Sequence, residues 1–245
     1  MKKKTIRLLI PFLLIGLFYL IPIRFIANYP PYESTSLIRI IYSFLTVNDC
    51  GHLWFLPTLL GIFIIATVLI RMTKSKQSTL ICIVLMLYIL SPYLSSFLLI
   101  TSTKYLFFFF MGYFINQYGK QIFSIKAIYH GLATLGILLI AYVLIFHNEN
   151  RVVTTFTSIT IIASLYYFMP HRTNRFILWL DKNSFGIYLF HSPLMYIIMN
   201  KFSIIAPPAI LVPMNLIFGI GGSLIITYFL RAIKCSFVIG EKNDR

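Results

Sequence analysis

Apolar runs long enough to cross a membrane recur along the whole chain. Eight of them lie near 8–26, 53–70, 79–94, 102–118, 127–146, 152–168, 184–201 and 211–231. Each approaches the roughly 20 residues that a helix needs to cross hydrocarbon, where backbone polar groups must be satisfied within the segment. Charged residues make up 11% of the chain, whereas soluble domains carry about 25%. We therefore predict an all-α fold, a polytopic membrane helix bundle of about eight transmembrane helices that forms a single domain over residues 1–245.

Basic residues are distributed unevenly between the two sides of this predicted bundle. Of the 21 lysines and arginines, 16 fall on the side that holds both termini. Positive charge marks the cytoplasmic side of membrane proteins, so we predict that both termini are cytoplasmic. The net charge of +15 is spread over short loops, which argues against nucleic-acid binding. The six acidic residues lie in loops or at the C-terminus, so no intramembrane carboxylate pair indicates a proton-driven pump.

The longest predicted outer segment covers residues 27–52. Its first part, Asn28–Glu33, contains two prolines and is typical of an extended turn. An amphipathic helix is predicted for 36–45, where we expect it to lie along the membrane interface. Its apolar residues have the i, i+3, i+4, i+7 spacing: Leu37, Ile40, Ile41 and Phe44. A second short interfacial element is predicted over 175–180, just before the seventh span. The three cysteines show neither a metal-ligand spacing nor a disulfide framework.

A polar stripe interrupts the seventh apolar run. In Ser184-Phe-Gly-Ile-Tyr188-Leu-Phe-His191-Ser-Pro193, the residues Ser184, Tyr188 and His191 share one helix face. Ionisable side chains are costly in hydrocarbon and usually face a bundle interior or a wet cavity. Pro193 has no N–H, so the carbonyl of Leu189 loses its helical partner and can accept another hydrogen bond. These features predict a polar site with His191 as its catalytic residue, although a single helix–helix hydrogen bond explains His191 equally well.

Two further groups of polar residues are candidates for binding. His52 and Trp54 open the second span just after Asp49, where they could contact a polar substrate. The alternative is an aromatic-belt tryptophan beside a solvated interfacial histidine. Lys4 and Arg7 lie one turn apart where the chain enters the membrane, and they could bind the phosphates of an anionic donor. Their alternative role is to set the topology and to attract anionic lipid.

Four segments together resemble the membrane-bound acyltransferase 3 family. Ser184-Phe-Gly-Ile-Tyr-Leu-Phe-His191-Ser-Pro is similar to a signature in one of the family's late helices, and His52-Leu-Trp-Phe-Leu-Pro57 is similar to its "lWFl" segment. Lys4-Thr-Ile-Arg7-Leu-Leu-Ile-Pro11 resembles the basic entry to the family's third helix. Phe110-Met-Gly112-Tyr113 resembles the aromatic-Gly-Tyr end of another helix. The motifs follow the family's order over nearly the whole chain.

This resemblance implies an O-acyltransferase. Such an enzyme is a multi-pass protein of the cytoplasmic membrane, in a bacterial setting, surrounded by membrane lipids. It moves an acyl group, often acetyl, from cytoplasmic acyl-CoA to a hydroxyl of a cell-surface glycan or its lipid-linked precursor. Acyl-CoA is the donor co-substrate, and no bound cofactor or metal is implied. The resemblance assigns Lys4 and Arg7 to the donor's phosphates. It assigns five residues to the polar cavity: His52, Trp54, Ser184, Tyr188 and His191.

The sequence departs from the family pattern at its beginning. Its first span resembles the family's third helix, and the arginine and catalytic histidine of the family's first helix have no counterpart. We therefore expect a chain that is truncated at its N-terminus relative to the family. It would act through His191, as a homo-oligomer, or with an N-terminal part supplied elsewhere. Two alternatives stay open. One is an inactive C-terminal fragment, and the other is a small-solute transporter, although no repeat between halves supports the latter.

Overall fold

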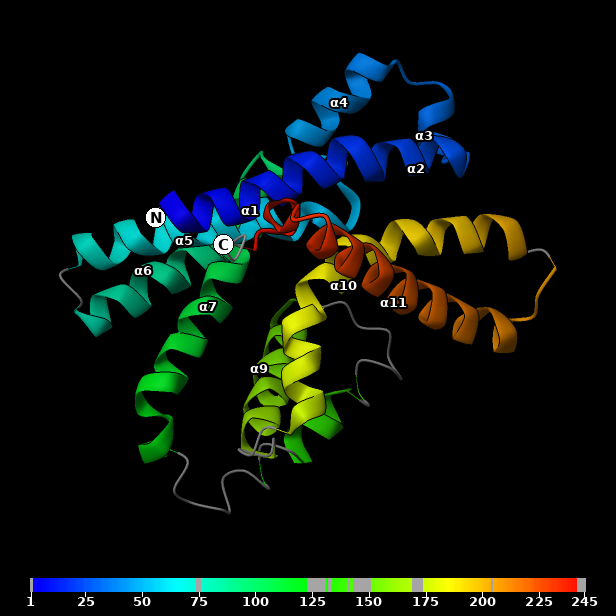
Figure 1. Ribbon diagram of the computed structural model, residues 1–245. Coiled ribbons are helices and arrows are strands. Elements are labelled where there is room, and N and C mark those ends of the chain that lie inside the picture. Colours follow the sequence, from blue (N-terminus) through cyan, green and yellow to red (C-terminus); the bar gives the residue numbers. More distant parts are fainter. Residues whose placement is uncertain are drawn as a thin grey trace. The chain divides into compact units, whose positions relative to one another are not determined.

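A computed structural model describes residues 2–73, 76–122, 131, 134–140, 142, 151–168, 174–203 and 205–241. Every regular element within these ranges is helical (Figure 1), which confirms the all-α prediction for them. The longer helices are α1 (Lys2–Ile15), α5 (Phe55–Met72), α6 (Gln77–Leu90), α7 (Phe97–Ile122), α9 (Arg151–Phe168), α10 (Arg175–Phe202) and α11 (Pro208–Ala232). The shorter elements are η1 (Gly16–Leu20), α2 (Ile21–Ile26), α3 (Pro30–Glu33), α4 (Leu37–Leu45), η2 (Gly51–Trp54), η3 (Ser91–Tyr93) and η4 (Ser236–Ile239).

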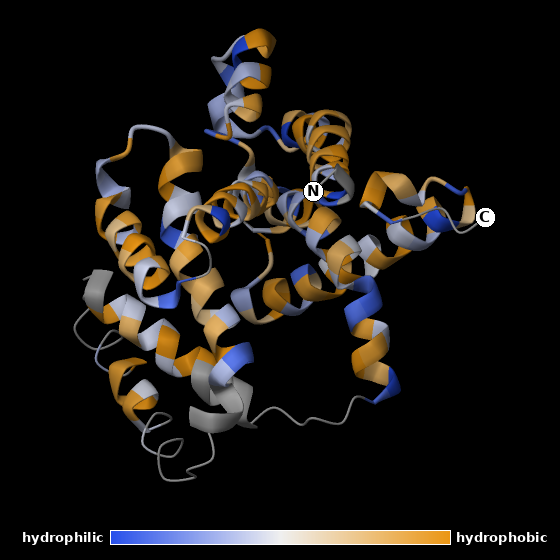
Figure 2. Ribbon diagram, turned by 90° about the vertical axis from the view of Figure 1, so that its left-hand side faces the viewer, coloured by the Kyte–Doolittle hydropathy of each residue, from blue (hydrophilic) through white to orange (hydrophobic). Residues whose placement is uncertain are grey.

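Four helical stretches among the described residues are long and apolar enough to cross a membrane. They are Lys4–Ile26, Gly51–Met72, Phe97–Tyr118 and Pro208–Ala232. Two shorter apolar helices cover Gln77–Tyr93 and Val153–Ile162, and hydrophobic residues occupy much of the helix surfaces (Figure 2). The predicted fifth span, 127–146, lies largely outside the described residues. The number of eight spans and the cytoplasmic placement of both termini therefore stay predictions.

Two local predictions are wrong. Asn28–Glu33 is not an extended turn, because Pro30–Glu33 forms the single helical turn α3 after an extended Tyr29. Proline is well tolerated in the first turn of a helix, where its missing N–H has no partner to lose. The second error concerns 175–180, which is not a separate element. It is the first part of α10, which continues without interruption through Pro193.

The predicted amphipathic helix is α4, and its apolar face packs on α1. Ile40 is 3% exposed and Phe44 is fully buried. The ring of Phe44 stacks on Phe12 with 4.6 Å between centroids, and it lies directly against Gly16, where a Cβ would overlap it. The opposite face of α4 leaves Ile38 82% exposed. Its position along a membrane interface stays a prediction.

The chain separates into two compact units, Met1–Lys104 with Arg175–Arg245 and Tyr105–Asn174. In the first unit, α1 packs on α5 and η4, α2 contacts α10, and α10 and α11 form the most extensive helix pair. The start of α1 and the end of the described chain lie side by side, because Leu8, Phe12 and Ile239 belong to one buried cluster. In the second unit, Gly136 lies close to α9, where its Cβ would be 3.2 Å from Oγ1 of Thr160.

Small residues allow α10 and α11 to approach closely. Gly186 lies against Thr227, so that an added Cβ would overlap the threonine side chain. Ser223 and Thr227 are fully buried one turn apart on α11, and Gly222 lies under Leu194. Helices in membranes associate mainly through such close packing, since lipid offers no hydrophobic driving force between them. This pair therefore fixes the frame that carries the polar stripe of α10.

We expect Gly186→Leu to disrupt this helix pair. No space is available beside Thr227, and overpacking of a tight contact costs about 1–3 kcal/mol. The measurement is thermal unfolding and size-exclusion behaviour of the purified protein in detergent. Gly221→Leu is the matched control, because a Cβ at Gly221 meets nothing within 4 Å. Equal stability of the two variants would contradict the packing described above.

Candidate active site

His52 is placed by the short turn η2, which joins the 27–52 segment to α5. Gly51, just before it, has φ of +52°, a conformation that favours glycine over residues with a side chain. A Cβ on Gly51 would also lie 2.6 Å from Nη2 of Arg24. Glycine is therefore required at this position for two independent reasons. The resulting turn directs the His52 ring toward α10.

The His52 ring bonds the carbonyl that Pro193 leaves without a helical partner. Its Nε2 lies 3.0 Å from the carbonyl oxygen of Leu189. A carbonyl oxygen only accepts hydrogen bonds, so Nε2 carries the proton and donates it. The prediction that the Leu189 carbonyl can accept another hydrogen bond is confirmed, and the donor comes from outside its helix. Because the proton is held at Nε2, the lone pair of neutral His52 is at Nδ1. That Nδ1 atom is buried and has no hydrogen-bond partner in the part of the chain that the structure describes.

His191 is oriented in the opposite sense. Its Nδ1 lies 2.9 Å from the carbonyl oxygens of both Ile187 and Tyr188, so Nδ1 carries the proton and Nε2 keeps the lone pair. The rings of His52 and His191 are 5.4 Å apart between centroids and inclined at 71°. The two histidines thus form a pair in which each ring is fixed by backbone carbonyls through one nitrogen. The other nitrogen of each ring is left as a hydrogen-bond acceptor or a base.

Two tyrosines hold the elements around this histidine pair together. The hydroxyl of Tyr188 donates to the backbone carbonyl of His52 at 2.6 Å. The hydroxyl of Tyr19, on η1, donates to the carbonyl of Phe190 at 3.3 Å. The contact between η2 and α10 is therefore reciprocal, since His52 bonds Leu189 and Tyr188 bonds His52. Tyr188, predicted to bind substrate, here positions His52.

The other predicted cavity residues lie at different distances from the pair. Trp54 follows His52 by two residues and is half-buried. Its ring lies against those of Phe55 and Phe97, at 6.1 and 6.4 Å between centroids. Ser184 is exposed and donates to the carbonyl of Asp181 within its own helix at 2.8 Å. It shares the predicted face of α10 with His191 but lies two turns away, about 10 Å along the axis. The structure thus brings together His52, Tyr188 and His191. The Trp54 ring contacts Phe55 and Phe97, and Ser184 lies at the edge.

Lys4 and Arg7 lie near the start of α1, away from the histidine pair. Both side chains are exposed, and Nζ of Lys4 lies 4.4 Å from the centre of the Phe63 ring. Tyr19 bonds the carbonyl of Phe190, next to His191, and lies about 18 Å beyond Arg7 on the same helical stretch. The two cations could therefore hold an anion at one end of the bundle, but they do not touch the histidines.

Sequence reasoning missed a buried arginine. Arg24 is 1% exposed, and its Nη1 donates to Oδ1 of Asp49 at 2.8 Å and to the Tyr32 hydroxyl at 3.1 Å. The rings of Tyr29 and Tyr196 lie 4.6 and 5.7 Å from its guanidinium carbon. Sequence analysis counted Arg24 only as an outer-side charge. The available signal was its place inside the apolar stretch Lys4–Ile26, where a charge needs a partner.

The same ion pair affects groups in the 27–52 segment. Burial raises the pKa of the Tyr32 hydroxyl, and the neighbouring Arg24 opposes this shift. Burial raises the pKa of the Cys50 thiol to about 11. Cys50 is therefore an inert, neutral thiol at physiological pH, and it is not a candidate nucleophile. No group of three or more His, Cys, Asp or Glu side chains within the described ranges could hold a metal ion.

The fold and the histidine pair define a class: a helical membrane protein in which backbone carbonyls orient two neighbouring imidazole rings. Comparison of the sequence with protein-family models names that class, because a family model described as an acyltransferase domain matches residues 1–232. The chain belongs to the acyltransferase 3 family, as its motifs had indicated, and is an integral membrane protein whose family chemistry is acyl transfer. No curated protein and no solved structure was found to match it.

Replacing Pro193 tests the bond that fixes the His52 ring. Pro193→Ala restores an N–H at position 193, which competes with His52 for the Leu189 carbonyl. We expect acyl transfer to fall about tenfold, as is typical when a group that orients a functional histidine is lost. Pro213→Ala, in the interior of α11, is the matched control and should leave the rate unchanged. An unaltered rate for Pro193→Ala would show that the bond has no role in transfer.

Alkylation tests the burial of Cys50. With a pKa of about 11, about one thiol in a thousand is ionised at pH 8, and the thiolate is the reactive form. In a chain with Cys82→Ser and Cys235→Ser, we expect N-ethylmaleimide to label Cys50 slowly in mild detergent and rapidly in SDS. The control is a chain with Cys50→Ser and Cys82→Ser, which keeps only the half-buried Cys235. Fast labelling of Cys50 in mild detergent would contradict the packing of the 49–52 turn.

Proposed function

We propose that this chain transfers an acyl group, most simply acetyl, from cytoplasmic acyl-CoA to a hydroxyl of a cell-surface glycan or its lipid-linked precursor. Family membership supports acyl transfer in general. The observation that carries the proposal is the geometry of His191, whose Nδ1 proton is anchored on two backbone carbonyls at 2.9 Å. This leaves Nε2 as a base in a fixed direction, which is what deprotonation of a hydroxyl requires.

The reaction needs one base and returns it unchanged. Nε2 of His191 takes the proton of the acceptor hydroxyl while the hydroxyl oxygen attacks the thioester carbonyl. The carbon–sulfur bond then breaks, and the coenzyme A thiolate leaves with the proton that the imidazolium returns. The products are an O-acyl ester and free coenzyme A. His191 ends in its original neutral form, so no further acid or base is consumed.

His52 is suited to hold the acceptor in place during this step. Its Nδ1 is a buried acceptor with no partner within the described ranges, and such an atom costs free energy unless a ligand or water bonds it. The ring lies 5.4 Å from that of His191 between centroids. A sugar carries hydroxyls on adjacent carbons, so two of them can approach the two rings together. One hydroxyl can donate to Nδ1 of His52 while the next loses its proton to His191.

Lys4 and Arg7 are suited to the donor's phosphates. Both are exposed at the end of α1 that is predicted to be cytoplasmic, and charge-assisted hydrogen bonds to phosphate are strong. Tyr19, which bonds α10 beside His191, lies about 18 Å further along this helix. A donor held at this end must therefore carry its thioester on a long arm, as coenzyme A does. Trp54 would form part of the wall at the reacting end, and Ser184 would contact ligands only at its margin.

The proposed setting is the bacterial cytoplasmic membrane, with both termini inside and the acceptor arriving from outside. Residues of an N-terminal part supplied elsewhere, or of a second copy of the chain, could complete the site. The experiment is transfer of radiolabelled acetyl from acetyl-CoA to a cell-surface glycan fraction, using the chain reconstituted in lipid vesicles. Flux of solute without a covalent product would instead indicate a transporter. Absence of both would indicate an inactive fragment.

We expect His191→Ala to abolish transfer. Loss of a general base lowers rates by about 10² to 10⁴, while α10 keeps its packing on α11, because His191 is only half-buried. Ser192→Ala, the next residue on the same helix, is the matched control and should retain the wild-type rate. Both variants should enter vesicles in equal amounts. Full transfer by His191→Ala would remove its assigned role.

A further inference from the structure

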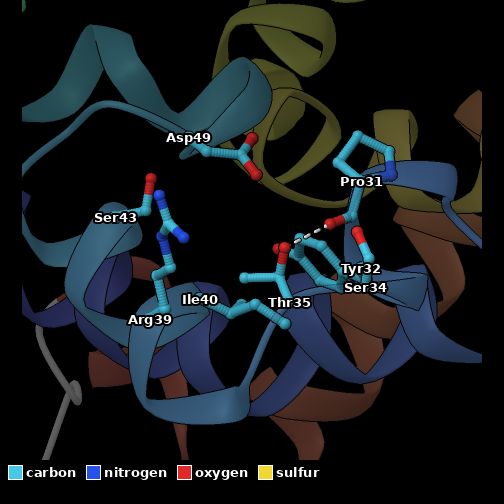
Figure 3. A pocket seen from close by; sticks show the side chains of 8 residues that line it. All are labelled: Pro31, Tyr32, Ser34, Thr35, Arg39, Ile40, Ser43 and Asp49. Carbon is cyan, nitrogen blue, oxygen red and sulfur yellow. Dashed lines mark hydrogen bonds between the residues drawn. The ribbon is translucent and has the colours of Figure 1, made fainter.

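A polar pocket opens in the 27–52 segment, outside the histidine site. Its volume is about 330 Å³, the size of a small-ligand site. The lining comes from α3, α4 and the chain just before η2 (Figure 3). Four hydroxyls and two opposite charges contribute to it: Tyr32, Ser34, Thr35, Ser43, Arg39 and Asp49. None of these residues was predicted to bind a ligand.

The two charges of this pocket keep bonding capacity for a ligand. Arg39 is exposed and forms no ion pair within the part of the chain that the structure describes. Asp49 places Oδ1 on Arg24 at 2.8 Å, and its other carboxylate oxygen makes no hydrogen bond among the described residues. Its side chain is 32% exposed. A guanidinium and a carboxylate oxygen are therefore both presented to the pocket.

This combination matches a neutral polyhydroxylated ligand better than an ion. Each sugar hydroxyl is both donor and acceptor, so it can bond a carboxylate and a guanidinium in turn. An anion would be attracted by Arg39 but repelled by Asp49, and a cation would meet the reverse. Tyr32 and Ile40 add a buried apolar wall against which the carbon face of a sugar ring can lie. The volume limits the occupant to about one sugar unit.

The pocket adjoins the turn that carries His52, the histidine paired with His191. Asp49 precedes His52 by three residues, a span of at most about 11 Å. A sugar bound at Asp49 can therefore extend its neighbouring unit to the His52 ring. Arg24 links the two places further, because it bonds Asp49 and lies against Gly51.

We propose that this pocket is the subsite that binds one neutral sugar unit of the acceptor glycan, next to the unit that is acylated. The inference rests on the proposed function, since it identifies the acceptor's chemistry. Arg39 and Asp49 hold ring hydroxyls, and Ser43 borders the space that the ring fills. The reacting hydroxyl belongs to the following unit, at His52 and His191.

The experiment measures saccharide binding separately from transfer. Maltotetraose and chitotetraose are titrated, by saturation-transfer NMR, against the full chain in lipid nanodiscs. The variants are Ser43→Phe, which fills the pocket, and Arg39→Gln, which removes its exposed cation. Each should weaken binding of the preferred saccharide about tenfold or more, the equivalent of one lost charge-assisted hydrogen bond. Lys76→Gln, an exposed cation outside the pocket, should bind like wild type.

The outcomes separate this inference from the proposed function. Saccharide binding that Ser43→Phe abolishes supports the subsite, even if the wild-type chain transfers no acetyl group. Transfer with an unchanged acceptor KM in Ser43→Phe overturns the subsite while the proposed function stands. Absence of binding of either saccharide to wild type also overturns it. Displacement of the saccharide by inorganic phosphate would show an anion site instead, and would overturn it as well.

Discussion

The arrangement of the candidate active site depends on one backbone carbonyl. Pro193 cannot donate to Leu189, and a buried carbonyl without a hydrogen-bond partner costs about 1–3 kcal/mol. The His52 ring supplies the missing bond at 3.0 Å, so the helix defect is stable only while η2 stays against α10. The same bond fixes which nitrogen of His52 keeps its lone pair. The single contact between His52 and Leu189 therefore satisfies a buried backbone carbonyl and also determines which ring nitrogen can accept a proton. Tyr188 adds a second hydrogen bond between the same two elements, because its hydroxyl donates to the His52 carbonyl at 2.6 Å.

Unsatisfied polar atoms are informative because the rest of the described chain leaves few of them. Three buried side-chain atoms have no hydrogen-bond partner there: Nε of Arg24, Nδ1 of His52 and Oδ1 of Asn215. Two of the three lie on residues that surround the Asp49–His52 turn. Buried polar groups in membranes are expensive, and charged ones are stable only when partnered. Arg24 meets this condition through Asp49 and three tyrosine rings. The stability of this turn is therefore tied to groups that a ligand can still bond.

The sequence predicted most of the longer described helices, the amphipathic α4 and the open carbonyl of Leu189, because these follow from local periodicity and from the chemistry of proline. It did not predict that His52 would donate a hydrogen bond to that carbonyl. The two residues are 137 positions apart, and only the packing of η2 on α10 brings them together. Ser184 illustrates the converse. Helical spacing put it on the His191 face, but its hydroxyl is satisfied within its own turn by Asp181. Arg24 was missed because charge patterning assigns a residue to a side of the membrane and says nothing about its burial.

The positions of these groups along α1 and α10 constrain the order of events under the proposed function. Lys4 and Arg7 lie at one end of the first helical stretch, Tyr19 bonds α10 beside His191, and Arg24 at the other end holds Asp49 of the sugar pocket. Donor phosphates and acceptor sugar are thereby kept at opposite ends, and the acyl group alone has to reach both. Tyr19 lies in η1, where the helix widens to a π turn, a geometry common at functional sites. Under the proposed function, the distance between the two ends of this stretch favours a donor with a thin, extended arm over a compact one such as an acyl phosphate.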